Sequence, residues 1–167
     1  MRREARVDAV STTLRTTSID RMTQSDAEAI AGWRYEPPYD FYDANSDERD
    51  LAELLDAGLR GEKYFAAHDE HGDLIGFFAF TTHDGVVNVG VGLRPDLTGL
   101  GLGLPFLERG LDFARGRFAP SGFRLTVAEF NRRAIIVYER AGFVATRSFP
   151  HDTNGGTFQF VEMECSA

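Results

Sequence analysis

The sequence has little that supports disulfide, metal or membrane chemistry. Its single cysteine, Cys165, leaves no partner for an internal disulfide and excludes a cysteine-based zinc cluster. The four histidines show no metal-ligand spacing such as His-x-x-x-His, so no metal is expected. No run of about 18 apolar residues occurs, so a membrane span is not expected either.

Basic residues are also scarce, and this bears on the partners. The chain has 18 Lys and Arg against 26 Asp and Glu, a formal net charge of −8. Such a chain repels polyanions unless its basic residues cluster, and no cluster is evident, so nucleic acid is not an expected partner. A cationic acceptor such as an amine is compatible with this charge.

The length of 167 residues and an apolar content of 43%, including 14 Phe, suit one domain with a substantial core. Residues 1–18 are rich in Arg and Ser/Thr and contain no apolar segment of a secretory signal. We expect a disordered leader over 1–11, a single domain over 12–167, and a cytoplasmic protein.

Hydrophobic periodicity predicts a mixed α/β fold. Apolar alternation predicts strands over 14–19, 64–68, 74–82, 86–93, 123–127, 143–149 and 157–165. Amphipathic spacing predicts helices over 20–33, from Ser46 to before Gly58, over 99–117 and over 131–141. The segment 34–43 holds Pro37 and Pro38 and is expected to be a loop. The expected fold is a mostly antiparallel sheet of about seven strands flanked by about four helices.

A glycine-rich loop joins the strand 86–93 to the helix 99–117. Residues 93–103 read LRPDLTGLGLG, with glycines at 99, 101 and 103. Strand, glycine loop and helix N-terminus together suit a phosphate, because backbone N–H groups approach it closely and the helix dipole favours an anion. The loop lacks the Gly-Lys-Ser/Thr of ATP-binding loops and the spacing of a dinucleotide fingerprint. Taken alone, the loop can also be a tight strand-to-helix turn.

A second motif lies in residues 125–143, LTVAEFNRRAIIVYERAGF. Asn131 and Tyr138 are seven residues apart, so two helical turns place them on one face together with Ala134. Asn131 is also well placed as a helix N-cap, and both roles are compatible. Gly142 stands where a helix-terminating glycine is expected.

The two motifs together resemble those of the GNAT superfamily of acyl-CoA N-acyltransferases. The family's Gln/Arg-x-x-Gly-x-Gly/Ala falls on residues 98–103, and its Asn-x-x-Ala and Tyr-x-x-x-Gly-Phe fall on residues 131–143. The resemblance covers roughly residues 12–165 and is strongest over 86–143. Thr98 departs from the usual Gln or Arg, so phosphate binding is expected to rest on backbone donors, supplemented by Arg132 or Arg133.

The resemblance implies direct transfer of an acetyl group from acetyl-CoA to an amine, either a small molecule or a protein N-terminus. It implies that Tyr138 is the general acid that protonates the departing thiolate. A homodimer is a further family-level expectation. The implied contacts to acetyl-CoA come from Val91, Gly92, Leu93, Thr98, Gly99, Leu100, Gly101, Leu102, Gly103 and Asn131.

The acceptor side and the general base are less constrained. By resemblance, the loop with Tyr35, Tyr39, Phe41 and Tyr42 lines the acceptor side; alternatively, these aromatics anchor the loop to the core. Thr126 and Asn88 stand where some relatives carry a catalytic glutamate. The remaining candidates for the base, each of which can equally be a surface carboxylate, are Glu129, Glu36, Asp40 and Asp43.

Two other functions stay open. One is a non-catalytic module of the same fold that binds or senses acyl-CoA, which the departure at Thr98 permits. The other is transfer to a hydroxyl, which demands a stronger base than the sequence nominates. Tyr138 favours catalysis, since a sensor has no need of an acid for a leaving group.

Overall fold

Seven strands form one sheet in the order β1-β2-β3-β4-β5-β7-β6, in a computed structural model that describes residues 15–167. All neighbouring strands are antiparallel except β4 and β5, which are parallel. The predicted leader over 1–11 lies outside the described residues. The strands are β1 (Thr16–Arg21), β2 (Tyr64–Asp69), β3 (Leu74–His83), β4 (Val86–Leu93), β5 (Gly122–Ala128), β6 (Val144–Thr153) and β7 (Gly156–Ser166).

Four helices of two or more turns accompany the sheet: α1 (Gln24–Ala31), α2 (Glu48–Leu55), α4 (Gly103–Phe118) and α5 (Arg132–Arg140). Single turns are α3 (Ala57–Arg60) and the 3₁₀ segments η1 (Tyr39–Tyr42), η2 (Ala44–Ser46) and η3 (Pro95–Leu97). The predicted mixed, mostly antiparallel α/β fold is therefore confirmed. Within residues 15–167, no helix is both long and apolar enough to cross a lipid bilayer.

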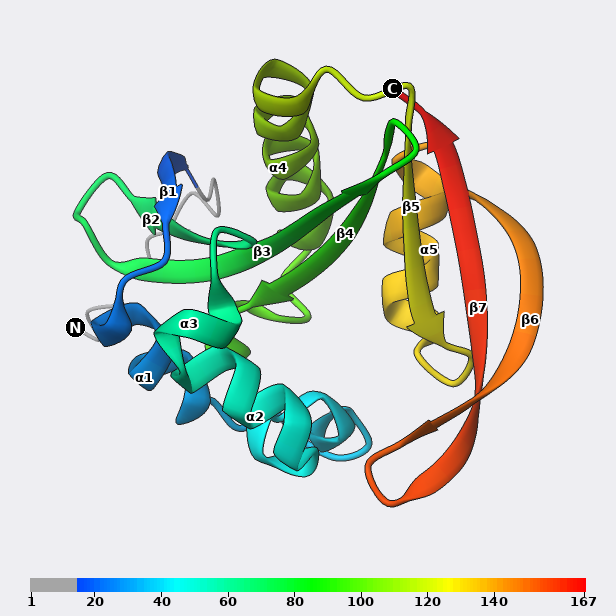
Figure 1. Cartoon of the computed structure of the whole chain (residues 1–167), viewed down its shortest axis with the longest axis horizontal. Coiled ribbons are helices and arrows are strands. Elements are labelled where there is room, and N and C mark those ends of the chain that lie inside the picture. Colours follow the sequence, from blue (N-terminus) through cyan, green and yellow to red (C-terminus); the bar gives the residue numbers. More distant parts are fainter. Residues whose placement is uncertain (1–14) are drawn as a thin grey trace, which may run out of the picture.

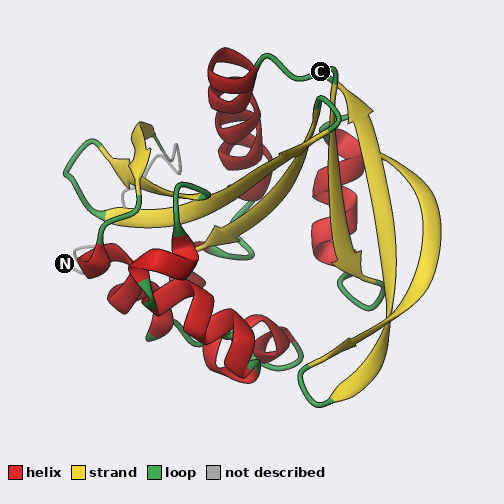
Figure 2. Cartoon of the chain, viewed as in Figure 1, coloured by secondary structure: helices red, strands yellow, loops and turns green. Residues whose placement is uncertain are grey.

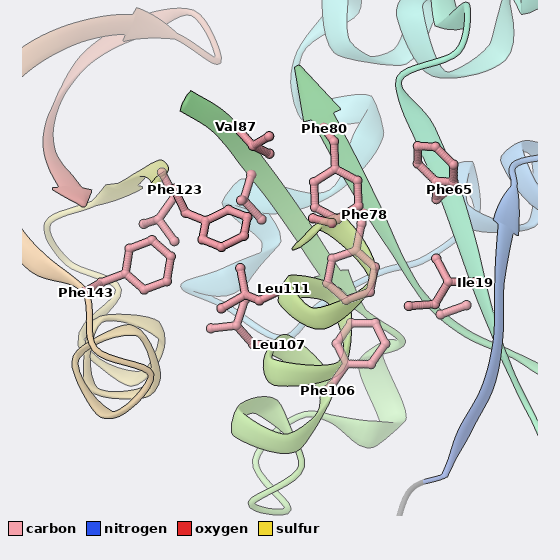
Figure 3. Packing of buried hydrophobic residues seen from close by; sticks show 14 of the residues in the cluster. Ile19, Phe65, Phe78, Phe80, Val87, Phe106, Leu107, Leu111, Phe123 and Phe143 are labelled. Carbon is pink, nitrogen blue, oxygen red and sulfur yellow. The ribbon is translucent and has the colours of Figure 1, made fainter. Parts of the chain in front are cut away.

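The helices cover the sheet in two groups, α4 with α5 and α1 with α2 and α3 (Figure 2). Side chains alternate between the two faces of a strand, so neighbours on β3 enter different cores. Phe78 stacks on Phe106 of α4 with ring centroids 4.7 Å apart, and Leu107 and Leu111 pack beside them (Figure 3). Phe77 joins the smaller cluster that α1 and α2 cover.

Strands β4 and β5 form a fork, which is the feature that positions the site. They pair only at their first residues, Val86 with Gly122 through Asn88 with Arg124, and then diverge (Figure 1). Both carboxyl ends therefore lie at the open end of the fork. The loop into α4 follows one end and the turn into α5 follows the other, so both helices begin there. Ligands in α/β proteins commonly bind beyond such strand ends.

Several predicted boundaries are wrong. The first strand covers Thr16–Arg21, not 14–19, and α1 begins at Gln24 because Thr23 caps it through a reciprocal bond with Asp26. Helix α4 begins at Gly103, not Gly99, since Gly99 and Gly101 adopt positive φ. Strand β6 runs on to Thr153, so much of the expected HDTNGG turn is strand.

Candidate active site

The N-terminus of α4 has free backbone donors. Each of α1, α2, α3 and α5 has a side-chain cap, whereas Leu102, at the cap position of α4, provides none, and no acidic residue lies in the first turn. The first N–H groups of a helix have no intrahelical partner and need another acceptor. They are therefore available to an anion at the open end of the fork.

The glycine loop leaves room in front of these donors. Gly99 and Gly101 have φ values of +73° and +76°, a left-handed conformation that glycine adopts without cost. A Cβ at Gly101 would meet no heavy atom within 4 Å, so it would project into open space. Gly103 lies against α5, where a Cβ would sit 3.4 Å from Val137. These features fit a pyrophosphate on the loop.

The other predicted loop residues have different surroundings. The Thr98 hydroxyl donates to the carbonyl of Pro95 at 2.7 Å, so this side chain stabilises the η3 turn. Leu102 is buried in the core, whereas Leu100 is 53% exposed. The cofactor-binding role of these residues stays a prediction.

Arg133 supplies a positive charge beside the loop glycines, because the loop's own Arg94 is paired with Asp96 at 2.7 Å. One of its guanidinium nitrogens lies 3.8 Å from the position of a Cβ on Gly99. The same guanidinium lies over the ring of Tyr39, 3.9 Å from its centroid, which is cation–π geometry. Arg133 thus connects the glycine loop to the segment 34–43.

Strand β4 presents part of its backbone to the fork. The Arg94 N–H donates to Ile75 of β3 at 2.8 Å, and hydrogen bonding alternates along an antiparallel pair. Gly92 therefore bonds toward β3, whereas Val91 and Leu93 turn their N–H and C=O groups toward the diverging β5. Of the three residues predicted to hold the pantetheine and acetyl groups, Val91 and Leu93 have the suitable backbone orientation.

Two tyrosines of the segment 34–43 bind the two ends of the fork. The Tyr35 hydroxyl donates to the Leu93 carbonyl at 2.7 Å, and the Tyr42 hydroxyl accepts from the Ala128 N–H at 3.2 Å. Burial raises the pKa of both phenols. These bonds satisfy backbone groups that β4 and β5 leave unpaired where the two strands diverge. Both tyrosines therefore anchor the segment to the sheet.

Tyr138 lies on α5 near Tyr42. Its ring packs edge-on against Phe143, with centroids 6.1 Å apart. Its hydroxyl makes no hydrogen bond to any residue in 15–167, and no fully buried side-chain oxygen there lacks a partner, so the hydroxyl of this half-buried side chain keeps some exposed surface. Burial of the side chain, with a smaller contribution from Tyr42, raises the pKa of Tyr138 above 10. A protonated phenol near the fork suits the predicted general acid, which stays a prediction.

Asn131 caps α5, accepting the Ala134 N–H at 3.2 Å, and is 9% exposed. Its side chain lies beside the Tyr42 hydroxyl and partly offsets the rise in the pKa of that group. The cap thus ties α5 to the segment 34–43. A direct contact of Asn131 with a cofactor stays a prediction.

The candidate bases separate into two kinds. The Asp43 carboxylate accepts the Tyr35 N–H at 2.9 Å and so has a structural partner inside its own segment. Glu36, Asp40 and Glu129 are exposed. The arrangement assigns the base to none of them, and an amine with a pKa near neutrality would need little assistance.

Two aromatic residues that the sequence did not single out pack against the segment 34–43. Phe41 packs edge-on against Phe130, at 5.3 Å, and against Phe158, at 4.9 Å. Phe130 lies in the turn from β5 to α5, and its place immediately before Asn131 was the available signal. Phe158 lies on β7, more than a hundred residues from Phe41, and only the fold brings them together.

Comparisons with known proteins agree with this geometry. The family model described as "Acetyltransferase (GNAT) family" matches residues 25–143. No curated protein matches the sequence.

Solved structures share the fold at low sequence identity. A spermidine N-acetyltransferase from Vibrio cholerae, in complex with CoA and spermine, is 19% identical with a TM-score of 0.71, covering 89% of this chain and 94% of that one. A GNAT-family acetyltransferase from Bacillus anthracis is 14% identical with a TM-score of 0.72, covering 92% of this chain and 96% of that one. At these identities the likeness shows the fold alone.

Proposed function

The chain belongs to the GNAT family of acetyltransferases, and from this premise we propose that it transfers the acetyl group of acetyl-CoA to the nitrogen of an amine. One observation carries the proposal. Uncapped amides of α4, the backbone of Val91 on β4 and the unpaired Tyr138 hydroxyl all lie around the open end of one fork. Bound there, acetyl-CoA supplies an activated acetyl thioester.

In this proposal, different groups around the fork bind the pyrophosphate and the thioester of acetyl-CoA. The N–H groups of the glycine loop and of the first turn of α4 hold the pyrophosphate, and Arg133 adds a positive charge beside Gly99. The Val91 N–H points into the fork, where it donates to the thioester carbonyl oxygen. A donor of this kind is typically worth about 10²-fold or more in rate.

Tyr138 gives its proton to the departing sulfur. A thiol of pKa about 8.5 is a fair leaving group without assistance, so this step needs only moderate help. The amine must be unprotonated when it attacks. An N-terminal amine, of pKa about 7.7 to 8.0, reaches that form readily near neutral pH, whereas an alkylamine of pKa about 10.4 needs desolvation or a base.

Calorimetry with a charge placed in the loop tests the proposal. Wild-type protein is expected to bind acetyl-CoA, and Gly101→Glu is expected to abolish binding, because a carboxylate at φ +76° would occupy the phosphate position. Gly116→Glu is the control for the added charge, since Gly116 lies exposed on α4, the helix that follows the loop, with open space around it. No binding by folded wild-type protein at millimolar acetyl-CoA would refute the proposal.

Release of CoA with an amine present then separates catalysis from binding. A protein that binds acetyl-CoA in the loop and releases CoA with an amine supports the proposed transfer. Binding without CoA release across a broad amine panel would indicate a non-catalytic acyl-CoA-binding module.

A further inference from the structure

An open pocket lies beside the segment 34–43, close to the fork. Its volume is about 470 Å³, within the usual range of small-molecule sites. Three segments distant in the sequence meet in it: the η1–η2 segment, the turn between β5 and α5, and the β6–β7 hairpin. The lining includes Asp40, Phe41, Ser46, Phe130, Asn154 and Phe158.

The pocket wall is mainly aromatic and is held in place. Phe41 packs edge-on between Phe130 and Phe158, with interplanar angles of 87° and 73°. Phe130 remains 40% exposed, so part of its surface is available to a ligand. Aromatic faces attract hydrocarbon and, through their quadrupole, cations. The wall therefore favours an apolar or cationic group over an anion.

The polar groups of the pocket are mostly occupied. The Ser46 hydroxyl donates to the Asp40 carbonyl at 2.8 Å, and the Asn154 amide donates to the Phe41 carbonyl at 2.7 Å. The Asn154 amide oxygen accepts the Thr153 hydroxyl. The Asp40 carboxylate has no hydrogen bond or ion pair with any residue in 15–167. The pocket thus combines aromatic surface with one unpaired negative charge.

The pocket and the fork are neighbours through Phe41 and Tyr42. The two rings pack edge-on at 5.1 Å, and the Tyr42 hydroxyl bonds the end of β5. An acceptor whose nitrogen reacts in the fork therefore meets this pocket when it extends past Tyr42.

We propose that this pocket binds the far end of the acceptor, and that the acceptor is an alkylamine carrying a second cationic group. The hydrocarbon arm lies along Phe41, Phe130 and Phe158, and the second cation pairs with Asp40. This inference rests on the proposed amine acetylation, since it names the substrate class of that reaction.

The test compares two amines that differ only in the second cation, hexamethylenediamine and n-hexylamine. Each is titrated by calorimetry into the wild-type protein, with and without CoA. The wild type is expected to bind the diamine roughly tenfold more tightly, in the range of a cation–π contact joined to a charge pair. Equal affinity for the two amines would overturn the inference.

Asp40→Asn then removes the charge with little change in shape. The ratio of the two dissociation constants is expected to fall from roughly ten to roughly three, because the charge pair is lost while the contact of the second cation with the aromatic rings remains. Asp84→Asn is the control, because Asp84 lies exposed in the β3–β4 turn with φ +49°, which Asn tolerates. If the ratio survives in Asp40→Asn, or falls equally in Asp84→Asn, the assigned pairing is wrong.

Phe130→Leu tests the aromatic wall separately. It keeps an apolar side chain but removes the ring, so it is expected to weaken diamine binding several-fold more than hexylamine binding. Equal effects on both amines would contradict the cation–aromatic contact. Because binding is measured without turnover, absence of CoA release would count against the proposed reaction while leaving the result for the pocket intact.

Discussion

Three tyrosines near the fork have raised pKa values, but their hydroxyls have different surroundings. The Tyr35 hydroxyl donates to the backbone of β4 at 2.7 Å, and the Tyr42 hydroxyl accepts from the backbone of β5 at 3.2 Å. Tyr138 keeps its hydroxyl free of partners within residues 15–167. A group that donates to a leaving thiolate must not be committed elsewhere. These bonds commit the proton of Tyr35 alone, since the Tyr42 hydroxyl is an acceptor, and both tyrosines hold the segment 34–43 against the sheet.

Replacing Tyr138 by Phe removes only that hydroxyl. We expect kcat for amine acetylation to fall by roughly 10- to 10³-fold, the usual range for a general acid. The Kd for acetyl-CoA should stay within about twofold, because no other contact is lost. Steady-state kinetics beside calorimetry makes the measurement. An unchanged kcat would remove Tyr138 from the mechanism.

The raised pKa of Tyr138 also constrains the pH dependence. Because burial favours the neutral phenol, Tyr138 stays protonated at all pH values up to its ordinary pKa of 10 and beyond. We therefore expect kcat/KM for an alkylamine to rise from about pH 7 to about pH 9.5 as the amine deprotonates, without a fall due to this tyrosine. A falling limb near pH 8 to 9 that disappears in Tyr138→Phe would contradict this assignment.

Arg133 and Arg132 were equivalent candidates in the sequence, and the structure distinguishes them. Arg133 lies beside Gly99 and over Tyr39. Arg133→Met should weaken acetyl-CoA binding by roughly 3- to 30-fold, a charge-assisted contact reduced by solvent screening. Arg132→Met, which removes the same charge one residue away, should have a smaller effect. Equal losses by calorimetry would indicate a general charge effect instead.

At the scale of elements, strand and helix types followed from local pattern. The apolar rows of α4 and the glycine after α5, Gly142 with φ +101°, were read correctly. The boundaries that failed depend on local backbone features that hydrophobic periodicity does not record, such as the Thr23–Asp26 cap and the positive φ of Gly99 and Gly101. Hydrophobic periodicity carries no information about φ, so the prediction extended α4 over Gly99 and Gly101, whose positive φ values are incompatible with an α-helix. The 3₁₀ turns of the segment 34–46 have no periodic signal, and their side chains find partners only in the folded sheet.

The contact of α4 with β3 fixes where the phosphate donors stand. A Cβ on Gly110 would lie 2.2 Å from the Phe78 ring, so Gly110 lets the helix approach the sheet. Gly110→Ala should destabilise the protein by about 1 to 3 kcal/mol, the usual cost of overpacking. Gly116→Ala, on the exposed side of the same helix, should stabilise it by up to about 1 kcal/mol. Thermal unfolding of both variants measures this, and equal shifts would contradict it.

At the scale of the whole molecule, the acceptor side is assembled from distant parts of the chain. Asp47 accepts the Asn154 N–H at 3.2 Å, and Asn154 in turn donates to the Phe41 carbonyl. These bonds link the segment before α2 to the β6–β7 hairpin across more than a hundred residues. The sequence motifs predict a cofactor side, since those residues are close in sequence, and that assignment stays a prediction. They could not place the acceptor pocket, because its lining depends on tertiary contacts.

The segment 40–53, which contributes to the pocket, carries an excess of negative charge, and this predicts that amine acetylation depends on salt concentration. The acidic residues of the segment 40–53 greatly outnumber its one basic residue, Arg49. They are Asp40, Asp43, Asp47, Glu48, Asp50 and Glu53. Such a field attracts cationic acceptors and is screened by salt over about 10 Å at 0.1 M.

We expect kcat/KM for an amine to fall several-fold between about 0.02 M and about 0.5 M sodium chloride, because screening weakens this attraction. On a logarithmic scale the slope for hexamethylenediamine should be roughly twice that for n-hexylamine, since the interaction scales with ligand charge. Potassium chloride at equal ionic strength is the control for ion-specific effects. Equal slopes for the two amines would mean that the second cation does not enter the field of this segment.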